Sequence, residues 1–451
     1  MEVLFLRFTH LGENIFKILS NENLVKCREV THSWNNYLDK QKFLLIRIIK
    51  ATILPFHDIG KSWQMVFSKA PTTTILEIDH AVQRFYQKDS KLIYNRGMTP
   101  SHVAAASGSL SLFKWVERKV QMKNPKDGEG FTPLHIAAQN NNFEVLKYII
   151  DGVEEKCPVD NDGWTPLHSA AKRGHFEICQ LIFVRNGFQN PGDNYGRTPL
   201  HCAASYGNLK ICNMIIEKVD DPNPFSQYLE ATPLHLAARN GHFEICKLIV
   251  ENSKVLDKNP RNNSGETPLH YASDYGHLEV CQLLIDMIEE KNPRAYDYRD
   301  TPLHNAAENN HLEICKLIIG KIGKKNPANE NGTTPLHHAA KNNNLEIYQL
   351  IIDSIDGVDK ENPINDNDTI SLDVTDNIEG AEKKNPRDEY GNTPLHFAAE
   401  NCNLDICKLI CQNLKDKNPK NKRERTPLDI ALDKKDLRIL YLLIGENNLQ
   451  F

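Results

Sequence analysis

The chain has 451 residues, of which 40% are hydrophobic and 25% are charged, and its formal net charge at pH 7 is −5. This mild negative charge argues against nucleic acid as the main partner. No apolar run reaches the roughly 18 residues that a membrane span needs. The apolar start, residues 1–8, is too short for a signal peptide and lacks a small-residue cleavage site. We therefore expect a protein of the cytoplasm or nucleus without a membrane partner.

Residues 1–50 carry apolar side chains at spacings that predict three short helices, around 10–20, 22–30 and 32–39. The apolar series is Leu11, Ile15, Leu19, Leu24, Val30 and Trp34. From Ile15 onward, its intervals of four, five, six and four residues resemble the core pattern of the F-box family, a small helical module. The family's opening Leu-Pro is missing, because Arg7 and Phe8 stand there.

The F-box resemblance implies a specific partner, the small Skp-type adaptor of cullin–RING ubiquitin ligases. On this interpretation, one face forms or supports the adaptor-docking surface, namely Leu11, Ile15, Leu19, Leu24, Val30 and Trp34. A module of about 45 residues has little core of its own, so these residues would also pack internally. The alternative is that the N-terminal helices only cap the repeats that follow.

Residues 51–94 predict a helical connector that leads into the first repeat. Pro55 and Pro71 interrupt it. After Pro71, apolar residues from Ile75 to Tyr86 fit an amphipathic helix of about 14 residues. We expect this helix to cap the N-terminal end of the repeats.

From residue 95 to the end, the chain is built on the tetrapeptide Thr-Pro-Leu-His. It begins at Thr132, Thr165, Thr198, Thr232, Thr267, Thr301, Thr334 and Thr393, with near-copies at Thr99 and Thr426. The steps between these repeat threonines are 33 to 35 residues, except for one of 59. A repeat of this period indicates a stacked-repeat fold more strongly than any single residue can.

The residues of each repeat predict a helix, a turn, a second helix and a loop. Thr suits a helix N-cap, and Pro suits the first helical position, where no N–H is needed. A pair of small residues follows, such as Ala203-Ala204, and then Gly207 or its equivalent ends the helix. A second apolar pattern and an Asn-Pro loop complete the unit. No unit can bury its apolar face alone, so stacking is required.

The motif and its period are those of the ankyrin repeat, and residues 95–451, about four-fifths of the chain, resemble that family. The resemblance implies an all-α solenoid of about ten full repeats plus one truncated repeat. It also implies a monomer that binds other proteins and performs no catalysis.

The step of 59 residues between Thr334 and Thr393 holds a truncated repeat near 364–386. We expect a local break in the stack there, with looser packing. The nearby aspartates, Asp366, Asp368, Asp373 and Asp376, do not form a calcium loop, because Ile370 interrupts them and no Gly occupies the required turn position.

Two residue types recur in columns. Six cysteines lie fourteen residues after the repeat threonine: Cys179, Cys212, Cys246, Cys281, Cys315 and Cys407. Other repeats place Phe113, Leu146 or Tyr348 there, which indicates an apolar core position. Nine histidines, three residues after the threonine, could suggest a metal, but hydrogen bonding within the turn explains them better. We expect no metal, no cofactor and no catalytic residue.

The positions that build the helices and turns carry the same residue types in every repeat. We therefore expect target binding at the positions where the repeats differ. These positions lie one and three residues before the repeat threonine and four, seven and eight after it. Tyr, Trp and Arg are the types that dominate binding hot spots. The predicted target-binding residues are Trp164, Arg173, Tyr195, Arg197, Tyr206, Arg239, Tyr271, Tyr275 and Tyr298.

Three functions remain to be compared. The first is a substrate receptor of a cullin–RING ligase, with the N-terminal module on the adaptor and the array on an unidentified target. The second is an ankyrin scaffold or inhibitor whose N-terminal helices only cap the stack. The third, an enzyme decorated with ankyrin repeats, has little sequence left to occupy.

Overall fold

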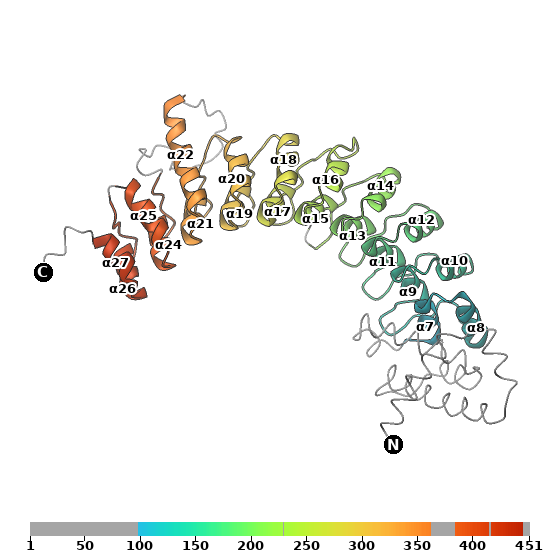
Figure 1. Ribbon diagram of the computed structural model, residues 1–451. Helices are drawn as coiled ribbons and strands as arrows, with labels where there is room; N and C mark the ends of the chain where they lie inside the picture. Colours follow the sequence, from blue (N-terminus) through green and yellow to red (C-terminus); the bar gives the residue numbers. More distant parts are fainter. Residues whose placement is uncertain (1–97, 229, 362–383, 415, 445–451) are drawn as a thin grey trace, which may run out of the picture. The chain divides into compact units, whose positions relative to one another are not determined.

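The computed structural model describes residues 98–228, 230–361, 384–414 and 416–444, drawn as coloured ribbons in Figure 1. The described residues form helices and connecting loops, without a strand among them. The predicted module at 1–50, with its six adaptor-docking residues, and the predicted connector at 51–94 lie outside this range. The all-helical fold is confirmed for the repeats.

The chain divides into two compact units, Met1–Ala170 with Glu177–Gly187, and Ala171–Phe176 with Phe188–Phe451. Each unit is described by itself. The first contains α7 (Pro100–Ser107), α8 (Leu110–Val120), α9 (Pro133–Gln139) and α10 (Phe143–Asp151). The boundary between the units falls within α11 (Pro166–Arg173) and next to the first residue of α12 (Phe176–Arg185).

The second unit continues the alternation of helices. Its helices are α13 (Pro199–Ser205), α14 (Leu209–Lys218), α15 (Pro233–Arg239), α16 (Phe243–Val250), α17 (Pro268–Tyr275), α18 (Leu278–Met287), α19 (Pro302–Glu308), α20 (Leu312–Ile319), α21 (Pro335–Lys341), α22 (Leu345–Glu361), α24 (Pro394–Glu400), α25 (Leu404–Asn413), α26 (Pro427–Lys434) and α27 (Leu437–Ile444). We call the first helix of each repeat, which starts at Pro of the tetrapeptide, the inner helix, and the second the outer helix.

The tetrapeptide starts each inner helix as predicted. Thr198 has extended backbone as the N-cap of α13, its side chain accepts from the N–H of His201, and Pro199 is the first helical residue. At the other end, Gly207 has φ 76° and Asn310 has φ 62°. Glycine and asparagine are the residues that adopt this left-handed conformation most easily, so they end the helix there.

The core lies between inner and outer helices and between successive repeats. In the second unit, α13 packs on α15, α15 on α17 and α17 on α19. The small pair, such as Ala203 and Ala204, is fully buried and allows this close approach. The six cysteines of the column are also fully buried, which confirms them as core residues. Burial raises the pKa of the Cys246 thiol to about 12, so this thiol stays protonated.

In the repeats that carry a Lys-Asn-Pro loop, side chains of the loop bond to the helix before it and to the helix after it. Lys325 Nζ donates to the carbonyl of Ile319, 2.7 Å away, at the end of α20. Asn326 Oδ1 then accepts from the N–H of Leu336 in the first turn of α21, at 3.2 Å. These bonds satisfy polar groups that helix ends leave without intrahelical partners. Asn-Pro was noted in the sequence as a loop marker, but not as a cap for two helices.

The predicted break at the truncated repeat is wrong. Inner helix α24 packs directly on inner helix α21, although 59 residues separate Thr334 from Thr393. His337 Nε2 lies 3.2 Å from the carbonyl oxygen of Asn392, and Asn403 Nδ2 donates to the carbonyl of Ala340 at 2.9 Å. Both bonds repeat those between ordinary neighbours. Inner helices α21 and α24 therefore stack as neighbours, and outer helix α22 has 17 residues (Figure 1).

This stacking predicts that residues 362–383 are dispensable for stability. Replacing them with a Gly-Ser linker of about ten residues should leave the urea midpoint of unfolding unchanged, because no described packing between α21 and α24 is lost. Urea titration followed by circular dichroism would measure the effect. If the segment were a working repeat, its removal would expose two apolar faces and lower the midpoint clearly.

Candidate functional site

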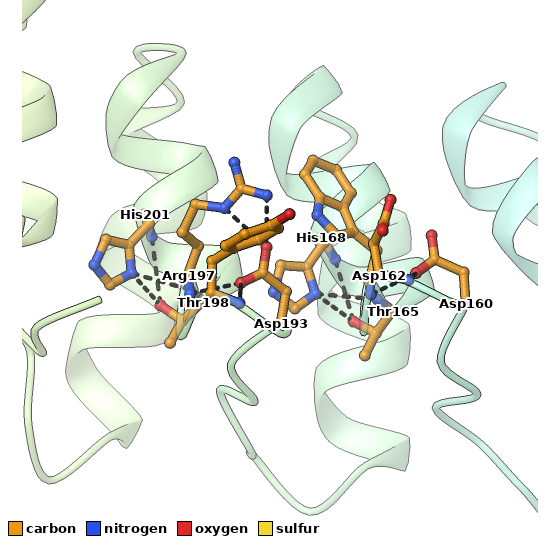
Figure 2. Close-up of polar contacts among 10 residues, drawn as sticks. Asp160, Asp162, Thr165, His168, Asp193, Arg197, Thr198 and His201 are labelled. Carbon is orange, nitrogen blue, oxygen red and sulfur yellow. Dashed lines mark hydrogen bonds and ion pairs between the residues drawn. The ribbon is translucent and has the colours of Figure 1, made fainter. Parts of the chain in front are cut away.

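Within each unit, the histidine column links one repeat to the next. The backbone N–H of the repeat threonine donates to Nδ1 of the histidine at 3.0–3.1 Å in all nine repeats that carry it. For eight of these histidines, Nε2 lies 2.9–3.2 Å from the carbonyl oxygen just before the following threonine. Figure 2 shows His168 and His201, each beside the threonine of its own repeat. The bond within the turn was predicted, whereas the bond between repeats was not.

This geometry assigns the neutral form of the ring. Nδ1 accepts from an N–H, so it carries no proton, and Nε2–H must donate to the carbonyl. Burial lowers the pKa of His135 and of His270 to about 3, although their backbone hydrogen bonds act in the opposite direction. The column is therefore neutral at physiological pH and serves the scaffold.

A second set of bonds runs back to the preceding repeat. The residue before the outer helix is Asn or His in most repeats, and its side chain donates to a carbonyl at the end of the previous inner helix. Examples are Asn208 to Ala171 at 2.7 Å and His311 to Asp274 at 3.0 Å. Within each unit, consecutive repeats are thus bonded at both ends of the inner helix, which holds the side chains on its exposed face in a regular array.

A tight hairpin precedes each inner helix and positions the side chains at its tip. Asp193 Oδ1 accepts from the N–H groups of Tyr195 and Arg197, at 2.9 and 2.8 Å. Asp160 makes the equivalent bonds in its own repeat, at 2.9 and 2.8 Å. Figure 2 shows both aspartates facing their hairpins. Gly196 has φ 72°, and an added Cβ would come within 2.6 Å of the Gln227 backbone nitrogen, so glycine is needed there.

The nine predicted target-binding residues are divided between the two units. Trp164 belongs to the first unit, where its half-buried indole lies 5.6 Å from the ring of His168. The other eight, from Arg173 to Tyr298, belong to the second unit. All of these eight side chains are at least partly exposed.

In the second unit, several predicted residues contact one another in pairs. The guanidinium carbon of Arg197 lies 5.1 Å from the centre of the Tyr195 ring, and Arg197 also forms an ion pair with Asp193 at 2.7 Å. The guanidinium carbon of Arg239 lies 5.1 Å from the centre of the Tyr275 ring, one repeat further along. These distances are within the range of cation–π attraction.

A family model described as Ankyrin repeats (3 copies) matches residues 76–157, 152–226, 219–297, 288–363 and 370–450. The chain belongs to the ankyrin-repeat family. No curated protein gives a significant match. The matched ranges begin at residue 76 and leave the F-box-like residues 1–50 outside. Ankyrin repeats imply a role in protein–protein interaction, and proteins of this family are typically scaffolds rather than enzymes.

The ankyrin array places two further side chains beside predicted ones and forms a third contact of the same kind between two residues that were not predicted. Lys172 Nζ lies 5.3 Å from the centre of the Tyr206 ring. Tyr228, 72% exposed, meets Tyr195 edge to face with ring centres 6.3 Å apart. Tyr296 lies under the guanidinium of Arg261, at 5.7 Å. Lys172 stands at one of the variable positions and could have been found, whereas Tyr228 lies four residues before its threonine, outside the positions we considered.

Not all predicted residues form one cluster. Tyr298 is exposed at the tip of its own hairpin, where its carbonyl accepts from the N–H of Glu330 at 2.8 Å. Tyr271 is half-buried, and its hydroxyl accepts from Asn262 Nδ2 at 3.2 Å. Tyr271 therefore also has a structural role between hairpin and helix.

Within residues 98–444, apart from the stretches left undescribed, no group of three or more His, Cys, Asp or Glu could hold a metal ion. The aligned histidines are each occupied by the hydrogen bonds given above. None of the helices that the structure describes is long and apolar enough to cross a membrane.

Proposed function

We propose that this ankyrin protein is the substrate receptor of a cullin–RING ubiquitin ligase. Its F-box-like residues would bind a Skp-type adaptor, and its ankyrin array would hold the target protein. One observation supports the target-binding part. In the second unit, the scaffold positions are buried and hydrogen-bonded, while the positions that differ between repeats carry exposed tyrosines and arginines.

The adaptor-binding part rests on the sequence pattern of Leu11, Ile15, Leu19, Leu24, Val30 and Trp34. A second function is compatible with the same array. In that case the protein is a scaffold or inhibitor outside the ligase system, and the N-terminal helices only cap the repeats.

A pull-down with purified Skp-type adaptor distinguishes the ligase receptor from the scaffold or inhibitor. Full-length protein should retain the adaptor in a pull-down, and Trp34→Ala or Leu24→Ala should reduce the retained amount by at least about tenfold, as expected for hot-spot residues. Tyr206→Ala, in the array, is the matched control and should retain the adaptor normally. Failure of the wild-type protein to bind the adaptor would remove the ligase function and leave the scaffold.

A further inference from the structure

The charge on the inner helices of the second unit changes sign along the stack. We define the inner surface as the positions one residue before and four, seven and eight after each repeat threonine. The ion pair between Arg425 and Asp433 shows that the first and third of these positions share a face. From α11 to α17, this surface carries four cations and two anions: Lys172, Arg173, Arg197, Arg239, Glu266 and Asp274.

The next three inner helices carry the opposite balance. On α19, α21 and α24 the same positions hold three anions and one cation: Asp300, Glu308, Glu400 and Lys341. Lys341 Nζ lies 3.6 Å from Glu308 Oε1, which balances part of this negative charge. Arg197 is paired with Asp193 at 2.7 Å, so Lys172, Arg173 and Arg239 make the α11–α15 end a positive patch on a chain whose net charge is −5.

The positive patch is also aromatic. Lys172 lies over Tyr206 and Arg239 lies over Tyr275, in the same two positions of successive inner helices, two repeats apart. A planar guanidinium stacked on a ring is held in orientation and can still direct its N–H groups to a carboxylate. Tyr206, 56% exposed, offers apolar ring surface beside these donors. The combination suits a ligand that presents both carboxylates and apolar side chains.

The patch sets a length for the acidic part of that ligand. Packed helices lie about 8–10 Å apart, so the two steps from α11 to α15 span roughly 20 Å. An extended chain covers about 3.3 Å per residue, which gives an acidic stretch of about six residues. Beyond α15, Glu266, Asp274 and Glu308 would repel a continuing polyanion.

We propose that the inner surface from Lys172 on α11 to Tyr275 on α17 binds an extended peptide segment whose Asp and Glu side chains lie against Lys172, Arg173 and Arg239. This inference rests on the proposed function and names the chemistry of the target that the array holds. A short acidic stretch with apolar neighbours fits the surface, whereas a long nucleic acid would meet the acidic helices that follow.

A random peptide library displayed on phage tests the proposal with the full-length chain. Selection on wild-type protein should enrich peptides rich in Asp and Glu. The variant Lys172→Glu, Arg173→Glu, Arg239→Glu should lose this enrichment, and it should bind a synthetic copy of the selected peptide at least about tenfold more weakly. The matched control, Lys210→Glu, Lys218→Glu, Lys247→Glu, makes the same change of net charge on outer helices α14 and α16, and it should behave as wild type.

The other outcomes are distinct. Acidic peptides that bind the first variant unchanged would overturn the assignment of this surface. Enriched peptides without an acidic excess, lost on Tyr206→Ala, would overturn the acidic specificity and leave the interaction function standing. No enrichment at all would count against both. A labelled single-stranded DNA that binds as tightly as the selected peptide, and loses binding in the same variant, would overturn the peptide as ligand.

Discussion

Between pH 6.5 and pH 5, the ankyrin array should lose much of its stability. In the unfolded chain, the histidines titrate near pH 6.5. In the folded array, burial lowers the pKa of His102 and His235 to about 4 and that of His337 to about 3. The unfolded state therefore binds more protons in this window, so the free energy of unfolding falls as the pH falls.

The hydrogen-bond geometry of the histidines also predicts that the free energy of unfolding falls as the pH falls. Protonated Nδ1 would face the threonine N–H, so two donors would meet where one hydrogen bond existed. Each such histidine should cost about 2 kcal/mol between pH 6.5 and pH 5, because one pKa unit corresponds to about 1.4 kcal/mol. Several of them acting together approach the roughly 5–15 kcal/mol by which a typical domain is stable.

Urea titrations at pH 7.5, 6.5, 5.75 and 5 would measure this loss. The slope of unfolding free energy against pH gives the number of protons taken up on unfolding. His235→Asn should lower stability at pH 7.5 and reduce this proton uptake by about one. A flat profile between pH 7 and pH 5 would contradict the neutral, buried assignment of the column. Carboxylates contribute little above pH 5, because they titrate near pH 4.

Leu167→Ala should lower the free energy of unfolding by about 2–5 kcal/mol. Leu167 is the leucine of the tetrapeptide in α11 and is fully buried. Removing its three terminal carbons leaves a cavity that the packed helices cannot close completely. The effect should appear as a lower urea midpoint at neutral pH.

Leu256→Ala is the matched control for this cavity, since the same atoms are removed from a side chain that is 93% exposed. Its urea midpoint should stay close to that of wild type. Equal midpoints for Leu167→Ala and wild type would show that the tetrapeptide leucine is not the core residue described above.

Most of the fold could be predicted because every repeat starts its helix, ends it and fills its core with the same types of residue. Thr198 and Pro199 start a helix, Gly207 ends it, and Cys212 occupies the core whatever its neighbours are. Interactions between repeats were harder to predict. The Nε2 bonds of the eight histidines described above depend on where the following hairpin lies, and that position follows from stacking rather than from sequence within the repeat.

The truncated repeat shows the limit of counting residues. Its length suggested a truncated repeat and a break in the stack, yet the Nε2 partner of His337 is supplied 55 residues later by the carbonyl of Asn392. The left-handed hairpin position was also only partly predictable. Glycine occupies it at Gly196, but Glu230, Arg299 and Glu424 adopt positive φ there without being glycine.

The candidate binding residues were predicted as types at variable positions, not as contacts. That rule placed Tyr206, Arg239 and Tyr275 on the exposed side of inner helices, where the structure also places them. It could not show that Lys172 covers Tyr206, or that Tyr228 meets Tyr195, because each contact joins side chains from different repeats.

Because α24 packs directly on α21, the position of the α24 repeat in the array does not depend on the length of the chain that joins it to α22. Because the hydrogen bonds from His337 and Asn403 fix the next repeat in its usual place, the chain between α22 and that repeat can change in length without displacing the helices that follow. A reporter or an entire folded module grafted at this point would be carried by the array while both flanking surfaces stay aligned. Mutation and selection could likewise lengthen or rewrite this segment independently of the residues that recognise a target.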